Sequence, residues 1–225
     1  MSAAKILIKL PSRERPDALR EALSRYATMC TNKADTKVML TLDDDNKFIE
    51  MDRDYWPAFI PRPQPRSTKI GATNRDLPGA WPWDILVVAS DDMWPIVHGY
   101  DDIIRKDMAE FFPDGDGALW YSDGRQNKHC TMPIMGRKYF DRFGYAYEPG
   151  YKSYHCDVEF TKVAQKDHQL AYIEDCLFQH EHPCFRGKVP EDDLYKHNRM
   201  DKSADLLYYL ERERNGFPCP APSSI

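Results

Sequence analysis

The sequence contains no long apolar run, no close pair of cysteines and no excess of positive charge. No stretch approaches the roughly 20 apolar residues that span a bilayer. The N-terminal residues Met-Ser-Ala-Ala-Lys also lack the apolar region of a secretion signal. The six cysteines are scattered without a Cys-x-x-Cys pair, a pattern typical of reduced thiols rather than a disulfide framework. We therefore expect a cytoplasmic protein with no membrane span.

The overall charge and composition are those of an ordinary globular protein. The 225 residues carry a net charge of −5, which argues against a general nucleic-acid coat. They are 42% hydrophobic and 12% aromatic, enough to form a sizeable core. Because we find no internal repeat, we expect one domain over residues 1–214 and a loosely ordered tail over residues 215–225.

Strand-like and helix-like patterns alternate along the chain. Runs of β-branched or alternating apolar residues predict strands at residues 5–10, 36–42, 85–89, 118–121 and 171–178. Apolar residues three or four apart predict helices at residues 16–29, 69–77, 101–112, 137–143, 157–166 and 203–214. We expect the last helix to start at the cap residue Ser203 and to bury Leu206, Leu207 and Leu210. This order predicts an α/β fold in which helices flank a mixed, mostly parallel central sheet.

The most informative stretch is a buried strand that ends in acids. Residues 85–89 are an unbroken apolar run, and Ser90, Asp91 and Asp92 follow it. A central strand delivers the residues after it to the carboxyl edge of the sheet, where open α/β folds bind ligands. Two acids at that edge favour a hard divalent cation such as Mg²⁺ or Mn²⁺. The alternative is that one acid caps a helix beginning near Pro95 and the other is solvated.

A second group of acids, residues 43–45, follows the strand at 36–42. The group lacks the glycine that an EF-hand loop requires, which excludes that calcium motif, and turn formation is its alternative role. Residues 55–66 then include four prolines, which predict a long irregular loop. The basic residues that are candidates for phosphate contacts in this region are Arg62, Arg66 and Lys69.

Several short motifs occur in a fixed order between residues 5 and 183. They are Pro-Ser-Arg-Glu-Arg-Pro at 11–16, the acids at 43–45, Ala-Thr-Asn-Arg at 72–75, Ser-Asp-Asp at 90–92, Thr-Met-Pro-Ile-Met-Gly at 131–136, Phe-Gly-Tyr at 143–145, Tyr-Lys-Ser-Tyr at 151–154, Asp-Val-Glu-Phe-Thr at 157–161 and His-Glu-His at 180–182. In this order they resemble a GT-A glycosyltransferase, particularly the family 2-like enzymes of bacteria and bacteriophages. The resemblance implies a single Rossmann-like domain, acting in the host cytoplasm if a bacteriophage encodes it.

The resemblance also implies roles for individual residues. The donor, a nucleoside diphosphate sugar with a UDP-sugar favoured, would contact Pro11, Ser12, Arg13, Arg15, Asp43, Asp45, Lys69, Asn74, Arg75, Ser90 and Asp91. The metal ligands would be Asp92, His180 and His182, and Asp157 would be the general base of an inverting transfer. The acceptor, a glycan, a protein or a modified DNA base, would lie against Asp123, Arg125, Tyr151 and Tyr154.

Sugar transfer has a chemical need for these residue types. A divalent cation stabilises the charge that grows on the diphosphate leaving group, and a histidine ligand favours Mn²⁺ over Mg²⁺. The acceptor hydroxyl loses a proton as it attacks, and a carboxylate such as Asp157 can accept that proton. The alternative role of Asp157 is to cap the helix that it begins.

Two residues depart from the family pattern, and they define the competing functions. Ser90 replaces the first acid of the Asp-x-Asp metal motif, and Cys156 replaces a glutamate that many members carry before the catalytic aspartate. A catalytically silent carbohydrate-binding module on the same fold would show such losses. A divalent-metal phosphohydrolase or nucleotidyltransferase is the other alternative, because it too places acids at strand ends.

Alternatives also exist for the late histidines and for the basic residues. His180 and His182 could form a structural zinc site with Cys176 and Cys184, although the spacing matches no standard pattern. A DNA acceptor would need a basic face, for which the candidates are Arg125, Lys128, Arg137, Lys138 and Arg142.

Overall fold

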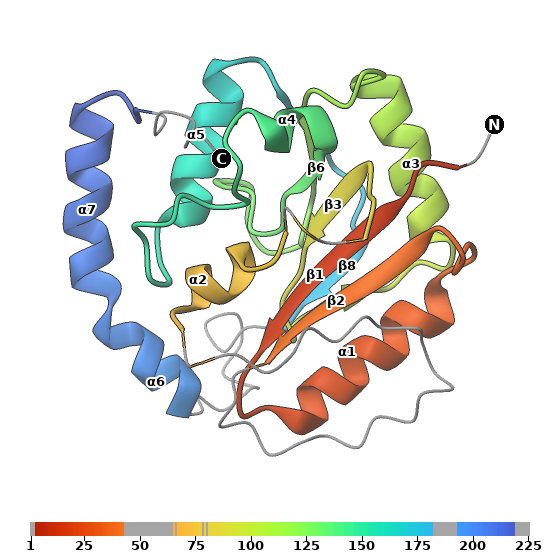
Figure 1. The fold of residues 1–225 in the computed structure, drawn as a ribbon, viewed down its shortest axis with the longest axis horizontal. Helices are drawn as coiled ribbons and strands as arrows, with labels where there is room; N and C mark the ends of the chain where they lie inside the picture. The colour runs from red at the N-terminus through yellow and green to blue at the C-terminus, as the bar shows by residue number, and fades with distance from the viewer. Residues whose placement is uncertain are drawn as a thin grey trace.

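The computed structural model describes residues 3–42, 65, 67–77, 79, 81–181 and 193–218, without the side chains of residues 194, 195, 197 and 198. Its centre is a six-stranded sheet in the order β2-β1-β3-β6-β5-β7 (Figure 1). These strands are β1 (Ile6–Ser12), β2 (Thr36–Leu42), β3 (Ile85–Val88), β5 (Ala118–Tyr121), β6 (Ile134–Gly136) and β7 (Leu170–Ile173). Strand β6 is antiparallel to β3 and β5, whereas the other pairs are parallel. The mixed, mostly parallel sheet predicted from the sequence is therefore confirmed.

Alternate residues of β1 face two different apolar clusters, one on each side of the sheet. Ile6 and Ile8 pack with α1 (Pro16–Met29) and α3 (Tyr100–Phe111). Leu7 belongs to the cluster on the opposite face, where the helices are α2 (Lys69–Asn74), α4 (Arg137–Asp141), α5 (Cys156–Lys166) and α7 (Lys202–Arg214). Helix α6 (Asp193–Met200) precedes α7, and both lie along one edge of the molecule, outside α5 (Figure 1). No helix among these residues has the length and apolarity that a membrane crossing requires.

Two short strands form a separate antiparallel pair beside the main sheet. They are β4 (Met93–Pro95) and β8 (Phe178–His180), with Met93 opposite His180. The alternative of a helix beginning near Pro95 is therefore wrong, because Pro95 ends a strand. The single strand predicted at residues 171–178 is also wrong, because β7 and β8 join different sheets. This change of sheet places His180 next to the residues that follow β3.

Helix α7 presents a different face to the core than its leucines indicate. Leu206, Leu207 and Leu210 are 41%, 70% and 44% exposed, and Asp201 occupies the N-cap position instead of Ser203. The buried residues of α7 are Asp205, Tyr209 and Arg212. The prediction failed because polar contacts fix the rotation of the helix. Arg212 forms a bidentate pair with Glu159 of α5 at 2.7 and 2.8 Å, and Asp205 accepts backbone N–H groups from residues 152–154.

Candidate active site

A cleft opens where β3 ends, as expected for the carboxyl edge of a mostly parallel sheet. It encloses about 850 Å³ of empty space, including the part open to solvent. Its walls come from α2, the residues after β3, the N-terminal end of α5 and β8. The predicted site residues that line it are Lys69, Ser90, Asp92, Tyr154, Asp157 and His180. Lys69 and residues from four separate motifs of the sequence therefore share one cleft.

Asp92 and His180 form a pair suited to hold a divalent ion. Asp92 Oδ1 accepts a hydrogen bond from Ser90 Oγ at 2.5 Å, and Asp92 Oδ2 lies 3.9 Å from His180 Nε2. Two ligands that are each about 2.1 Å from one ion lie about 3 to 4 Å apart, so the spacing fits a shared ion. One carboxylate oxygen and one imidazole nitrogen also suit Mn²⁺. The hydroxyl of Ser90 acts here by fixing the Asp92 carboxylate.

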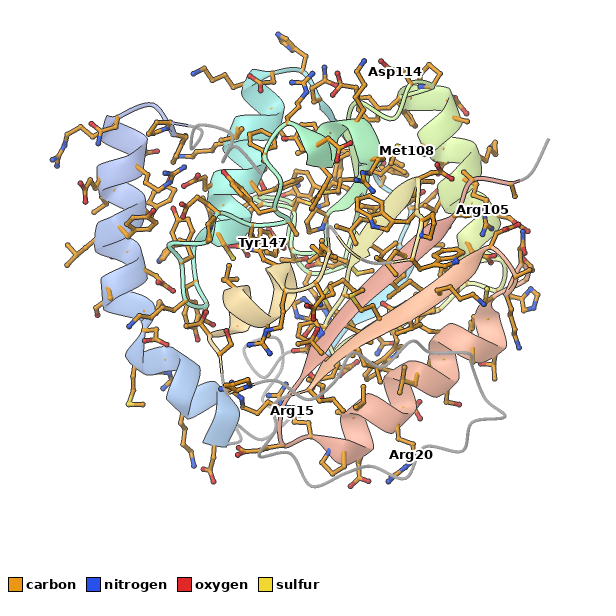
Figure 2. The ribbon with its side chains drawn as sticks, viewed as in Figure 1. Arg15, Arg20, Arg105, Met108, Asp114 and Tyr147 are labelled. Atoms are coloured by element: carbon orange, nitrogen blue, oxygen red, sulfur yellow. The ribbon has the colours of Figure 1, made fainter. Side chains whose placement is uncertain are left out.

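Asp91 lies beside Asp92 but interacts with the end of β1. Its carboxylate accepts hydrogen bonds from Ser12 Oγ at 2.7 Å and from Arg15 Nη1 at 3.1 Å. Figure 2 shows Arg15 at the N-terminal end of α1. Burial and the neighbouring Asp92 charge raise the pKa of Asp91, against the opposing effect of Arg15 and Ser12. Asp91 therefore joins the loop after β1 to the loop after β3.

Asp157, the predicted base, is in the first turn of α5 and is partly exposed. Its Oδ1 accepts the N–H of Val158 at 2.9 Å, and its Oδ2 lies 3.4 Å from His129 Nε2. The residue at the N-cap position is His155, so Asp157 lies inside the first turn and not at the N-cap position that the alternative gave it. Its carboxylate is thus oriented from two sides while it lines the cleft.

The loop after β5 connects the region of His180 with that of Asp157. Asp123 is buried and accepts backbone N–H groups from Arg125 and Gln126 at 2.9 and 3.1 Å. Gln126 in turn accepts the N–H of His129 at 3.1 Å and donates to the His129 carbonyl at 2.7 Å. One hydrogen-bonded loop therefore carries both Asp123, which faces His180, and His129, which faces Asp157.

Several residues assigned to the donor have structural partners instead of lining the cleft. The Asn74 side chain bonds to the backbone of Ala146 and Tyr147, so it holds that loop against α2. Figure 2 shows Tyr147 beside α2. Arg75 donates to the Pro65 carbonyl at 3.0 Å, and Arg13 donates to the Ser67 carbonyl. Pro11 lies within β1. These residues therefore hold neighbouring segments together, and their assignment to the donor stays a prediction.

Lys9 is a buried cation that the sequence did not single out. It is 0% exposed, and its Nζ donates to the Arg75 carbonyl at 2.6 Å and to Thr41 Oγ1. Burial lowers its pKa to about 8, with the Asp76 charge raising the pKa and the Arg75 charge lowering it. Lys9 thus connects β1, β2 and the end of α2.

The two predicted acceptor tyrosines differ in position. Tyr154 lines the cleft, whereas Tyr151 is 1% exposed and donates its hydroxyl hydrogen to Glu159 at 2.7 Å. Tyr151 therefore packs in the core, and the placement contradicts its assignment as an acceptor contact. Arg125 is close to Glu181, at 4.0 Å, and neither Asp123 nor Arg125 lines the cleft.

The basic residues in α4 and directly after it do not form an uncompensated positive face. Arg137 pairs with Asp141 at 2.8 Å. Lys138 pairs with Asp114 and Arg142 pairs with Asp116, each at 2.6 Å. Because aspartates neutralise these three cations, this cluster does not support a DNA acceptor.

Some predicted site residues lie outside the described part of the chain, namely Asp43, Asp45, Arg62, Arg66, His182 and Cys184. Among the described residues, no group of three His, Cys, Asp or Glu side chains is arranged to hold a metal. Cys176, a candidate zinc ligand, instead donates its thiol to the Phe178 carbonyl at 3.3 Å. The Asp92–His180 pair is therefore the part of the expected metal shell that the structure describes.

Sequence reasoning missed His129, Lys9 and Asp205. His129 belongs to no motif, and its only signal is its place in a polar, glycine-bearing loop after a strand. Lys9 interrupts an apolar strand, which is a usable sign of a special role for a buried charge. Asp205 lies about fifty residues after the segment 152–154 that it contacts, and no local sequence pattern marks it.

No family model and no curated protein match the sequence. Among solved structures, the mannosyltransferase PcManGT of Pyrobaculum calidifontis, in complex with GDP-Man and Mn²⁺, has a TM-score of 0.70 at 14% identity, over 98% of this chain and 67% of its own. S. aureus TarS 1-349 with UDP-GlcNAc has a TM-score of 0.61 at 12% identity, over 90% of this chain and 66% of its own. Against the longer TarS structure, the match covers only 43% of that chain. These similarities, together with the sheet order and the cleft, show that the chain has the GT-A glycosyltransferase fold.

Proposed function

We propose that the protein is a metal-dependent glycosyltransferase that moves a sugar from a nucleoside diphosphate sugar to an acceptor hydroxyl. The observation that carries the proposal is the shared cleft, which Asp92, His180 and Asp157 all line. The similar structures support it, because one is a complex with GDP-Man and Mn²⁺ and another a complex with UDP-GlcNAc. We favour a UDP-sugar as the donor and a hexosyl or pentosyl transfer.

Each cleft residue has a role in this reaction. Asp92 Oδ2 and His180 Nε2 would hold the ion, and Ser90 keeps Asp92 in place. A bound Mn²⁺ or Mg²⁺ would stabilise the charge on the departing diphosphate. Lys69, at the start of α2, adds a positive charge to the same wall.

Asp157 is the base in this proposal. Its carboxylate would accept the proton of the attacking hydroxyl, with Val158 and His129 fixing its orientation. A base that activates the acceptor for direct attack on the sugar carbon gives inversion. Tyr154, on the same wall, offers an aromatic ring for an acceptor sugar to stack against.

The test is release of UDP or GDP from a panel of sugar nucleotides with Mn²⁺, using water and simple glycosides as acceptors. We expect release from one class of nucleotide, abolished by a chelator and about 10²- to 10⁴-fold slower in Asp157→Asn. Asp167→Asn is the matched control, because Asp167 is an exposed carboxylate at the opposite end of the same helix. An absence of release from every donor, or equal rates in Asp157→Asn and Asp167→Asn, would contradict the proposal.

A further inference from the structure

We propose that Asp123 is a positioning residue that orients His180 for metal binding, in place of the acceptor contact expected from the sequence. The inference rests on the metal site of the proposed function. His180 ends β8, and its ring lies between two carboxylates. Its Nε2 is 3.9 Å from Asp92 Oδ2, and its Nδ1 is 3.7 Å from Asp123 Oδ2. Each ring nitrogen therefore faces a different acid.

Asp123 is held in place by its own loop and is not available to a substrate. It is 6% exposed and does not line the cleft. Its Oδ1 accepts the N–H groups of Arg125 and Gln126, and its Oδ2 accepts the Thr131 hydroxyl at 3.2 Å. The residue is thus held by its own loop, with its Oδ2 facing the His180 ring.

The position of this acceptor determines which form of His180 is favoured. A neutral imidazole binds a metal through the nitrogen that lacks a proton, and the hydrogen bond made by the other nitrogen selects that form. A carboxylate beside Nδ1 places the proton there and leaves the Nε2 lone pair directed toward Asp92. Without that carboxylate, the form protonated at Nε2 competes, and it cannot bind the ion.

The two distances from the His180 ring to its carboxylates are compatible with a small movement of the ring when an ion binds. Both ring nitrogens are slightly too far from their carboxylates for a hydrogen bond, so a small movement of the ring brings Nδ1 into bonding distance of Asp123. Asp92 and His180 Nε2 would then hold the ion. Ser90 stands where the Asp-x-Asp motif has an acid, so it supplies no negative charge near the ion. The charges of Asp92 and Asp123 would compensate for part of that difference.

Asp123→Asn is the most informative variant. The amide oxygen can still accept the backbone N–H groups of Arg125 and Gln126, so the loop is retained. The amide NH₂ would then face Nδ1, and it cannot accept a hydrogen from the ring. Asp107→Asn is the matched control, because Asp107 accepts one hydrogen bond, from the Tyr121 hydroxyl at 2.7 Å, and does not line the cleft.

The experiment is a titration with Mn²⁺ in which the free ion is measured by electron paramagnetic resonance, with UDP or GDP present. If the wild-type protein binds Mn²⁺, we expect the Asp123→Asn variant to bind it about 10- to 100-fold more weakly and the Asp107→Asn variant to bind it equally well. Adding Asp123→Asn to His180→Ala should weaken binding no further, because the effect of Asp123 passes through His180. Equal Mn²⁺ affinity in wild type and Asp123→Asn would overturn the inference and leave the proposed function intact.

If wild type does not bind Mn²⁺, the metal site of the proposed function fails and the inference fails with it. A second measurement needs no variant at Asp123 and so does not depend on that variant folding. ¹⁵N chemical shifts of labelled histidine, with His180 assigned through His180→Gln, report which nitrogen carries the proton in the neutral ring. We expect the proton on Nδ1, and a proton on Nε2 in the wild-type protein would overturn the inference.

Discussion

The carboxylate of Asp205, on the last helix, accepts a hydrogen bond from the backbone N–H of Tyr154, 2.7 Å away. The same carboxylate accepts the N–H groups of Lys152 at 3.0 Å and Ser153 at 2.8 Å, and it is 2% exposed. Residues 152–154 lie three to five positions before Asp157. Helix α7 therefore fixes the segment that carries a wall of the cleft and leads into the proposed base.

Removing the Asp205 carboxylate should destabilise the protein considerably. Asp205→Ala leaves three backbone N–H groups without their acceptor, and hydrogen bonds to charged groups contribute about 1.5 to 3 kcal/mol each. Allowing for water that enters, we expect a loss of about 2 to 4 kcal/mol in the free energy of unfolding, measured in urea. A loss below about 0.5 kcal/mol, the range of ordinary surface substitutions, would show that these bonds do not hold the segment.

The exposed face of α7 gives a second prediction. Leu207 is 70% exposed, so Leu207→Ala should change the free energy of unfolding by less than about 0.5 kcal/mol. Leu40→Ala is the matched control, because Leu40 is 0% exposed in β2 and such a substitution costs about 2 to 5 kcal/mol. Similar losses of unfolding free energy in the two variants would mean that α7 buries Leu207, which would contradict the helix rotation described above.

Lys9 should make stability depend on pH in alkaline solution. Its pKa is about 8 in the folded protein against 10.5 as the ordinary value, so the unfolded chain binds more protons between these pH values. The stability contribution of Lys9 therefore rises with pH across this window, and the cost of burying its charge is fully present below pH 8.

The comparison that isolates this effect is wild type against Lys9→Met, because titration of the other groups cancels in the difference. We expect the stability of wild type relative to Lys9→Met to rise by up to about 3 kcal/mol between pH 8 and pH 10.5. Urea unfolding at several pH values measures it. A stability difference that stays constant across the window would show that Lys9 stays protonated in the folded protein as it does in the unfolded chain, and that burial does not lower its pKa.

Placing an acid at position 90 should lower the stability of the protein in chelator and increase the stabilisation by Mn²⁺. Ser90→Asp removes the hydrogen bond from Ser90 Oγ to Asp92 and adds a third carboxylate beside Asp91 and Asp92. Repulsion among these charges should lower stability by about 1 kcal/mol in chelator. In Mn²⁺ the variant should gain more in melting temperature than wild type does. A smaller gain than that of wild type would mean that residue 90 does not face the ion.

The sequence predicted those elements whose own residues set their limits. Helix α1 and strand β2 have the predicted limits, because Pro16 suits a first helical turn and residues 36–42 combine β-branched with apolar residues. Strands β4 and β8 were missed because three residues are too few to show a period, and their pairing is a tertiary contact. The face of α7 was wrong because the Arg212–Glu159 pair, invisible in a hydrophobic pattern, holds the polar side inward.

The residues of the candidate site also differ in how far the sequence predicted them. Asp92, Asp157 and His180 were predicted because each lies in a motif at the end of a strand or the start of a helix, and the fold brings these ends together in one cleft. Their roles stay predictions. Tyr151 was misplaced because an aromatic residue near the site can equally pack in the core. The orienting contacts of His129 and Asp123 join segments far apart in the sequence, so only the folded chain reveals them.

The central claim is that the cleft binds a nucleoside diphosphate through a metal held by Asp92 and His180. The most direct measurement is thermal unfolding of wild type and Asp92→Asn with a panel of nucleoside diphosphates, in Mn²⁺ and in chelator. At a ligand concentration of about a hundred times the dissociation constant, we expect one nucleotide to raise the melting temperature of wild type by about 5 to 10 °C in Mn²⁺. The shift should vanish in chelator and in Asp92→Asn. No shift with any nucleotide, or the same shift in chelator, would contradict the claim.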